Sequence, residues 1–328
     1  MPASEESLFV VWNGYQRRAE VLAPRLNARV VWLPNRWRSR YLRPLDYLRK
    51  LVETYRVVRD YRPRFLVLQS PPPFGALAAM ALRVPYVVDA HNASLQGFWA
   101  KVPLTRLIAR RAVAVVAHND EAKAIADARF PGSVVTVLRD PLDLELCAQR
   151  AAARDPNRVL IVCSFAADEP IALIHDLIAA RSDLEFVITA RVEKLAPTWR
   201  ERFERLPNLR LPGFLPTARY NELLVTSGAA VVLTERSATQ PSGACEALAS
   251  DTPLVVSRTS LTESLFGGWA QLVEHDVVSI AAAIDRARGS RLDLSEERAA
   301  WTRAFETELE ELRSRLAGLS ASTVRSPS

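Results

Sequence analysis

The 328-residue sequence has only three cysteines, four histidines and eleven glycines. Cys147, Cys163 and Cys245 stand far apart, and their odd number argues against a disulfide framework, while no pair has metal-ligand spacing. No apolar run approaches the roughly 20 residues that a transmembrane helix needs. The first seven residues are polar and acidic, unlike the basic start of a secretory signal. We therefore expect a reduced, cytoplasmic chain without a metal site.

What is present is ordinary globular composition. Hydrophobic residues make up 49% of the chain and charged residues 24%. The length exceeds the usual size of a single core and favours two domains. The formal net charge of +6 indicates an anionic partner, such as phosphate or an acidic surface.

Short apolar runs alternate with helical patterns through the first half of the chain. Runs without internal alternation are typical of strands buried on both faces of a parallel sheet. The predicted strands are residues 8–12, 28–33, 65–69, 86–89, 112–118 and 134–138, with a helix at 15–26. This alternation predicts a doubly wound α/β domain.

The pattern stops between Asp140 and Pro156, a polar and alanine-rich stretch that we interpret as a linker, and then restarts. Predicted strands follow at 158–163, 184–189, 209–211, 229–233 and 253–257, with helices at 169–180, 198–205, 218–226 and 243–250. A last helix begins near Asp293, and helical spacing aligns Trp301, Phe305, Leu309, Leu312 and Leu316 on one face.

The resulting division is an N-terminal Rossmann-like acceptor domain at 1–150 and a C-terminal Rossmann-like donor domain at 151–292. A C-terminal helix at 293–319 is expected to pack back, and a disordered tail to follow at 320–328. Ligands of such sheets bind beyond the carboxyl ends of the strands, so we expect a site in a cleft that the two domains face.

The segment that follows the strand at 229–233 carries the clearest donor-site pattern. A helix opens near Ser242 and Gly243, and the free N–H groups at a helix N-terminus favour phosphate. Glycine would let an anionic ligand approach the backbone. Glu246, on the first turn, offers a carboxylate to ribose hydroxyls. A capped helix whose dipole Glu246 complements explains the spacing equally well.

The run GACEALASDTPLVVS, from Gly243 to Ser257, resembles the donor-binding segment of GT-B glycosyltransferases of family 4. In that family a Glu-Ala-Met-Ala-x-Gly-x-Pro-Val-Val run carries the ribose-binding glutamate, which Glu246 matches. The stretch LRLPGFLP, with Gly213, resembles a second family segment. The resemblance implies a metal-independent transferase whose donor is a nucleoside-diphosphate sugar, and no cofactor. It places Ser242, Gly243 and Ala244 at the diphosphate.

The N-terminal half resembles a narrower group. LQSPP from Leu68, followed by VDAHN from Val88, is similar to a pattern of short bacterial GT-B enzymes and of the β-mannosyltransferase that acts on lipid-linked chitobiose. In these families the histidine after the strand faces the cleft. The resemblance therefore implies that His91 acts at the donor phosphates or the acceptor hydroxyl, with Asp89 orienting it or sharing its role. A loop histidine bonded to backbone is the alternative, and for His118 we expect a structural role.

Several positions depart from the family pattern. Its second glutamate is replaced by Ala238, so Thr239 or Gln240 is expected to contact the sugar. Ser164 stands where a glycine-rich turn is usual. For the diphosphate-holding basic pair, Arg191 and Lys194 are the best substitutes. Asn13 and Gly14 close the first strand, where GT-B enzymes place a loop near the donor phosphates, although a simple turn also explains them.

The segment between Arg36 and Arg64 contains ten basic and three acidic residues with five interleaved aromatics. Such a composition favours an anionic membrane surface. A solvated helix whose apolar residues are core is the alternative, because Leu48, Leu51, Val52, Tyr55 and Val58 follow helical spacing. A nucleic-acid groove is the least favoured interpretation.

The sequence thus predicts a GT-B hexosyltransferase that moves a sugar to an acceptor hydroxyl, on a glycan or a polyprenyl-linked precursor. Such an acceptor would place the protein peripherally on the inner face of the plasma membrane. The alternative is a catalytically inactive GT-B partner subunit that binds nucleotide sugar, which the missing glutamate at Ala238 favours.

Overall fold

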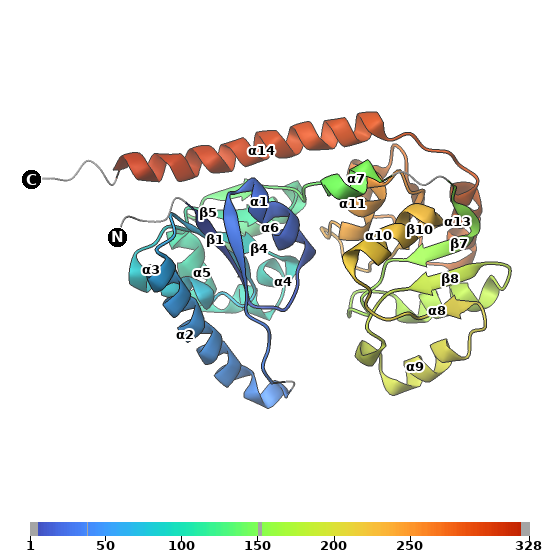
Figure 1. Cartoon of the computed structure of the whole chain (residues 1–328), viewed down its shortest axis with the longest axis horizontal. Helices are drawn as coiled ribbons and strands as arrows, with labels where there is room; N and C mark the ends of the chain where they lie inside the picture. The colour runs from blue at the N-terminus through green and yellow to red at the C-terminus, as the bar shows by residue number, and fades with distance from the viewer. Residues whose placement is uncertain (1–5, 38, 150–152, 323–328) are drawn as a thin grey trace, which may run out of the picture. The chain divides into compact units, whose positions relative to one another are not determined.

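The computed structural model describes residues 6–37, 39–149 and 153–322, and divides the chain into two compact units (Figure 1). The N-terminal domain extends to Pro141 and includes the chain from Thr302 onward. The C-terminal domain is Leu142–Trp301. Each contains one six-stranded sheet in which every pair of neighbouring strands is parallel.

The sheet of the N-terminal domain has the order β2-β1-β3-β4-β5-β6. Its strands are β1 (Ser7–Val11), β2 (Ala28–Trp32), β3 (Leu66–Ser70), β4 (Tyr86–Ala90), β5 (Ala114–Ala117) and β6 (Val135–Val137). The order reverses between β1 and β3, which makes their carboxyl ends the expected place for a ligand.

Helices cover both faces of this sheet. They are α1 (Arg17–Arg25), η1 (Arg40–Leu42), α2 (Arg43–Tyr61), α3 (Gly75–Leu82), α4 (Asn92–Leu95), η2 (Phe98–Lys101), α5 (Pro103–Arg111) and α6 (Asp120–Arg129). Successive residues of a strand point to opposite faces. Leu8 and Val10 accordingly join the core beneath α2 and α3, whereas Phe9 and Val11 pack with α1 and the C-terminal helix.

The sheet of the C-terminal domain has the order β12-β11-β10-β7-β8-β9. Its strands are β7 (Asp155–Ile161), β8 (Glu185–Ile188), β9 (Leu209–Arg210), β10 (Ser227–Val232), β11 (Leu254–Ser257) and β12 (Gln271–Val273). The first three strands run outward from β7 and the next three from β10, on its other side. The order therefore reverses between β7 and β10, as in a dinucleotide-binding sheet.

The helices of this domain are α7 (Leu144–Ala148), α8 (Ile171–Ala180), η3 (Val192–Lys194), α9 (Pro197–Glu204), α10 (Thr217–Thr226), α11 (Ser242–Ala249), α12 (Ser260–Phe266) and α13 (Val277–Arg288). Two cores form, one on each side of the sheet. In β7, Val159 and Ile161 face one core, and Leu160 faces the other.

The last helix, α14 (Ser295–Ser322), belongs to both domains. Its predicted apolar face is confirmed, because Trp301, Phe305, Leu309, Leu312 and Leu316 are all buried. Trp301 stacks on Phe266 of the C-terminal domain, with ring centroids 5.9 Å apart. Phe305 and the three leucines complete the core of the N-terminal domain.

Three sequence-based boundaries need correction. The domains divide at Pro141 rather than residue 150, because Leu146 is buried in the C-terminal core. The predicted linker contains helix α7, which Asp143 caps by accepting from the backbone of Glu145 at 2.9 Å. The predicted tail from 320 is also shorter, since α14 continues to Ser322. Residues 323–328 lie outside the described part of the chain.

Among the described residues, none of the helices combines the length and the apolar character needed to cross a membrane.

Candidate functional site

The carboxyl ends of β3 and β4 bring together the polar residues at the centre of the N-terminal site. Asp89 lies at the end of β4, and His91 follows as the N-cap of α4. Gln69 is the second-last residue of β3, and Gln16 caps α1 after β1. The sheet order reverses between β1 and β3, and β4 lies next to β3, so the fold itself gathers the four side chains.

His91 Nε2 contacts three side chains. It lies 3.2 Å from Asp89 Oδ2, 3.2 Å from Gln16 Nε2 and 3.4 Å from Gln69 Nε2. Gln16 is held in this orientation because its Oε1 accepts from the backbone N–H of Ala19 at 2.7 Å. The contacts of Nε2 require opposite tautomers, because Asp89 accepts from a protonated Nε2 whereas the Gln16 amide donates to an unprotonated one. The Nε2–H tautomer, which leaves Nδ1 unprotonated, is the one in which Nδ1 acts as the general base.

Asp89 is anchored by a buried arginine from helix α1. Arg18 Nε donates to Asp89 Oδ1 at 3.0 Å, Nη1 donates to Asp140 at 2.5 Å, and Nη2 donates to the Leu138 carbonyl at 2.7 Å. Burial by itself would raise the pKa of Asp89, but the Arg18 charge outweighs it and holds that pKa well below its usual range. The carboxylate therefore stays ionised.

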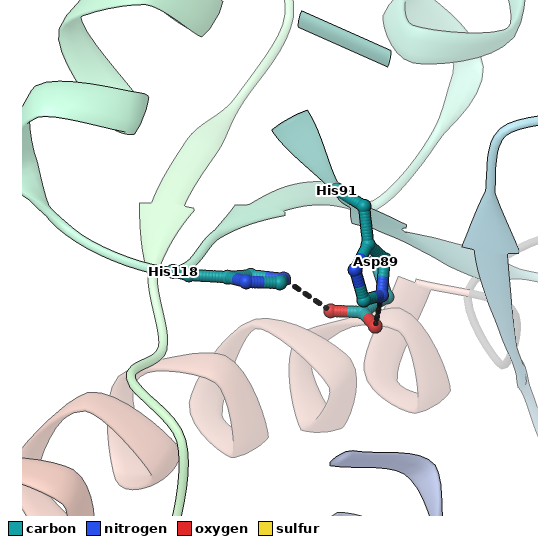
Figure 2. A group of neighbouring side chains, drawn as sticks. All are labelled: Asp89, His91 and His118. Atoms are coloured by element: carbon teal, nitrogen blue, oxygen red, sulfur yellow. Dashed lines mark hydrogen bonds and ion pairs between the residues drawn. The ribbon is translucent and has the colours of Figure 1, made fainter. Parts of the chain in front are cut away.

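His118, which follows β5, lies on the other side of the same carboxylate. Its Nε2 is 3.5 Å from Asp89 Oδ1, and its ring packs edge-on against His91 with centroids 4.7 Å apart. Figure 2 shows the two imidazoles reaching different oxygens of Asp89. Burial and the Arg18 charge lower the pKa of His118. His118 is therefore neutral at physiological pH and supports Asp89 by contact.

This lowered pKa makes stability depend on pH. Below about pH 6.5 the unfolded chain binds a proton on His118 that the folded chain resists, so stability falls as pH falls. We expect the wild type to lose about 1 kcal/mol more than His118→Asn between pH 7.5 and 5.5. Urea unfolding of both proteins at the two pH values measures the difference. An equal pH dependence would contradict the assignment.

Asp89, His91 and His118 also offer three possible metal-ligand atoms within 4.8 Å of one another. However, Arg18 already places a fixed positive charge on Asp89 Oδ1. A divalent cation at this position would be repelled by that guanidinium. The cluster is therefore better suited to proton transfer, with the Asp89 charge balanced by Arg18, than to metal binding.

Asn13 and Gly14 follow β1 in the exposed segment that leads into Gln16. Gly14 N–H donates to Asn13 Oδ1 at 2.8 Å. A Cβ on Gly14 would meet only Pro34 Cβ at 3.6 Å, an ordinary contact, so the turn does not demand glycine. Two residues after Gly14, Gln16 contacts His91, so the pair is close in the chain to the His91 cluster.

In the C-terminal domain, the predicted donor segment leaves β10 at the point where the sheet order reverses. Helix α11 begins there at Ser242, after Pro241, without a side-chain cap. The N–H of Ala244 is already engaged, since it donates to the Pro241 carbonyl at 3.1 Å. The backbone N–H groups of Ser242 and Gly243 are therefore the better candidates for an anion.

Gly243 has a packing role that differs from the predicted one. A Cβ at this position would lie 2.8 Å from Val162 Cγ1 and 3.2 Å from Val232 Cγ2. Glycine thus lets α11 lie close against β10 and the end of β7, and its φ is not in the left-handed region. The approach of a ligand to its backbone N–H stays a prediction beside this packing role.

Glu246, the predicted ribose ligand, is half-buried on α11. The Tyr220 hydroxyl from α10 donates to its Oε2 at 2.5 Å. A charge-assisted bond of this kind fixes the carboxylate and favours its ionised form. Tyr220 is therefore a positioning residue for Glu246 that sequence reasoning missed.

The loop before α11 carries a strained alanine. Ala238 has φ of 54°, in the left-handed region, and is buried. Alanine adopts this conformation at a cost of about 1–2 kcal/mol. Thr239 follows, with its hydroxyl 3.5 Å from the Ser237 carbonyl, and Gln240 Nε2 contacts Cys245 Sγ at 3.5 Å. The loop holds the two predicted sugar ligands at the same end of the sheet as α11.

Ser164 lies in the loop after β7, and a carboxylate of the protein itself, that of Glu169, occupies this loop. The carboxylate of Glu169 accepts from the N–H of Ser164 at 3.0 Å and of Ala166 at 2.7 Å. The Cys163 thiol donates to it at 3.1 Å. Glu169 therefore fills the backbone amide nest that a glycine-rich turn would offer to phosphate.

The two predicted cations lie after β8. Lys194 Nζ donates to the Ser164 carbonyl at 3.2 Å, which keeps its charge beside the Ser164 loop. Arg191 instead stacks on Phe214, with Cζ 5.1 Å from the ring centroid. Lys194 is consequently better placed than Arg191 to face an anion at that loop.

Arg18, His118, Asp140, Gln16 and Gln69 were not predicted as site residues. His118 and Asp140 follow β5 and β6, so their positions after strands were an available signal. Gln69 lies near the end of a strand inside the recognised motif. Arg18 and Gln16 had no such signal, because their role depends on the rotation of α1 against the sheet.

Comparisons with known proteins agree with this architecture. The family model of the "Glycosyl transferase 4-like domain" matches residues 4–141. No curated protein matches the sequence. A trehalose-phosphate synthase (UDP-forming) from Burkholderia vietnamiensis superposes with a TM-score of 0.67 at 15% identity, over 98% of this chain and 100% of that one.

Two further structures are similar. Sucrose-phosphate synthase from Thermosynechococcus elongatus has a TM-score of 0.67 at 15% identity, over 97% of this chain and 100% of that one. Anabaena HepE, solved with UDP and glucose, has a TM-score of 0.62 at 13% identity, over 93% of this chain and 100% of that one. The chain thus has the GT-B fold of these glycosyltransferases, and its residues 4–141 match a glycosyl transferase 4-like domain.

Proposed function

We propose that the protein is a glycosyltransferase that moves a hexose from a nucleoside-diphosphate sugar to an acceptor hydroxyl. The observation that carries the proposal is His91, held by Asp89 and Gln16 within the part of the chain that matches the glycosyl transferase 4-like domain. An ionised carboxylate behind a half-exposed histidine is the arrangement that activates a hydroxyl.

The C-terminal domain binds the donor in this proposal. The diphosphate rests on the N–H groups of Ser242 and Gly243, and Lys194 adds a positive charge. Glu246, oriented by Tyr220, accepts from the ribose hydroxyls. The departing diphosphate is stabilised by these fixed dipoles and charges, without a metal ion. The binding of UDP by the similar HepE supports a donor of this class.

The N-terminal domain binds the acceptor. His91 takes the proton of the acceptor hydroxyl, and Asp89 stabilises the imidazolium that forms. A glycan or a polyprenyl-linked precursor is the proposed acceptor, since LQSPP and VDAHN resemble enzymes acting on lipid-linked chitobiose. Such an acceptor would bring the protein to the cytoplasmic face of a membrane.

Glu246→Ala tests the donor site. Losing charged hydrogen bonds to the ribose is expected to weaken UDP or GDP binding about 10- to 100-fold in calorimetry. The nucleotide affinity of Tyr220→Phe is expected to lie between those of Glu246→Ala and the wild type, because the Glu246 carboxylate remains but Tyr220 no longer orients it. Glu263→Ala, an exposed glutamate on α12, is the matched control and should bind normally. Wild-type affinity in Glu246→Ala would count against the proposal.

A second candidate is a nucleotide-sugar-binding partner subunit without catalysis. Ala238, at the place of the second family glutamate, is the observation that favours it. The Ala238 backbone keeps a left-handed conformation without that carboxylate, which supports a functional loop shape. Donor turnover that depends on His91 would exclude this alternative.

A further inference from the structure

Helix α2 carries its apolar stripe on the outside of the N-terminal domain. Leu45 and Leu48 are 55% and 59% exposed, and Val52 and Tyr55 are 40% and 37% exposed. Tyr41, just before the helix, is 82% exposed. These residues follow one another at helical spacing on one face. Leu48, Val52 and Tyr55 are therefore not core residues, whereas Val58 is buried in the core and Leu51 packs against it, so the core alternative holds for only part of the set.

The inward face of α2 packs Leu51 and Val58 into the domain core and also carries buried polar groups. Asp46, Lys50 and Thr54 are almost completely buried. Lys50 Nζ donates to the Trp12 carbonyl at 3.0 Å and to Asn35 Oδ1 at 2.6 Å, and the Trp12 indole donates to Thr54 at 3.0 Å. Rotating the helix to hide the leucines would break these bonds and leave a buried lysine unpaired. The polar network thus fixes the apolar stripe outward.

Basic residues flank the stripe. Arg43, Arg56, Arg59 and Arg62 are exposed. Of the three acidic residues, Asp46 is buried, Glu53 is bonded to Arg49 at 2.9 Å, and the exposed Asp60 is paired with Arg59 at 2.9 Å. Arg38 and the Arg40 side chain lie outside the described residues. The exposed charge near the stripe is therefore mostly positive, and Figure 1 shows α2 along the edge of the N-terminal domain.

A second apolar group lies beside α2. Trp99 of η2 packs edge-on against Tyr47 of α2, with centroids 6.0 Å apart. The next residue back, Phe98, is 72% exposed, and Lys101 at the end of η2 is also exposed. The η2 segment begins three residues after the end of α4, whose N-cap is His91, so this surface is close in the chain to the proposed base.

We infer that this face of α2, with Phe98, docks onto an anionic lipid surface. Leucine, valine and tyrosine side chains enter the acyl boundary while the arginines meet anionic headgroups. A lipid fits better than a protein because the exposed charge that borders the apolar stripe is mostly positive. The link from this docking to a lipid-linked acceptor rests on the proposed function. The docking itself does not, because it needs neither donor nor acceptor.

Vesicle flotation of the full-length protein tests the inference. Wild type is expected to bind vesicles of phosphatidylcholine with about 30 mol% phosphatidylglycerol, and to bind pure phosphatidylcholine less. Leu45→Ser with Leu48→Ser should lower binding to both at least about tenfold. Arg56→Gln with Arg59→Gln should lower it about tenfold for anionic vesicles alone, as high salt should. Val278→Ser, on an exposed valine of α13, is the control and should bind like wild type.

Two outcomes would overturn the inference. One is vesicle binding that the leucine changes leave intact in folded protein, as judged by an unchanged thermal midpoint. The other is a dimer in light scattering that the leucine changes convert to a monomer, which would make the face a self-association surface. UDP affinity measured in the same preparations separates a failure of docking from a failure of the proposed donor site.

Discussion

His91→Ala is expected to lower the turnover number for sugar transfer by about 10²- to 10⁴-fold, the usual contribution of a positioned general base. The loss should appear in kcat because the imidazole acts as the acceptor hydroxyl loses its proton. UDP affinity should be unchanged, since every proposed nucleotide ligand belongs to the C-terminal domain. Steady-state kinetics with a nucleotide-sugar donor, paired with calorimetry, measures both.

His175→Ala is the control for this prediction. His175 lies on α8 of the C-terminal domain, packed against Trp199 and Phe203, and has no proposed part in the reaction. Wild-type turnover in His91→Ala would remove the histidine from the mechanism. A parallel loss of UDP affinity would instead assign it to donor binding.

The strands were predictable because burial on both faces imposes a continuous apolar pattern. Eleven of the twelve strands coincide with a predicted run, and the exception, β12, is only three residues long with two half-buried positions. The α7 segment was mistaken for a linker because a five-residue helix has too few positions to show a period. The sequence marked this helix only by Asp143, which caps its N-terminus, and by Leu146, its buried apolar residue.

The candidate site was predictable only where a motif or a strand end marked it. Asp89 and His91 come from such a motif, and the structure places them in contact. Two partners of Asp89, Arg18 and His118, lie 71 positions before it and 29 after it, so only the folded sheet reveals them. Arg18 sits within a helical pattern, where arginine usually faces solvent.

The orientation of α2 shows the same limit. Its apolar residues predict a helix correctly, and Leu51 and Val58 turn inward as a hydrophobic stripe normally does. They do not predict that a second apolar stripe stays exposed. The buried bonds of Lys50 and Thr54 with Trp12 and Asn35 hold that stripe outward, and they are visible only in the tertiary structure.

Arg18→Met is expected to cost about 3–5 kcal/mol of unfolding free energy at neutral pH, because it leaves Asp89 and Asp140 buried without their counter-charge. The present low pKa values of both carboxyls depend on Arg18, despite burial that acts in the opposite direction. Without it their folded pKa values rise above the unfolded ones, so the variant should gain stability relative to wild type as pH falls toward about 4. Arg17→Met is the matched control, since the guanidinium of this neighbouring residue pairs with the exposed Glu20 at 3.3 Å. That change should cost less than about 1 kcal/mol. Equal losses for the two methionine variants in urea unfolding would show that Arg18 is not the charge that keeps Asp89 ionised behind His91.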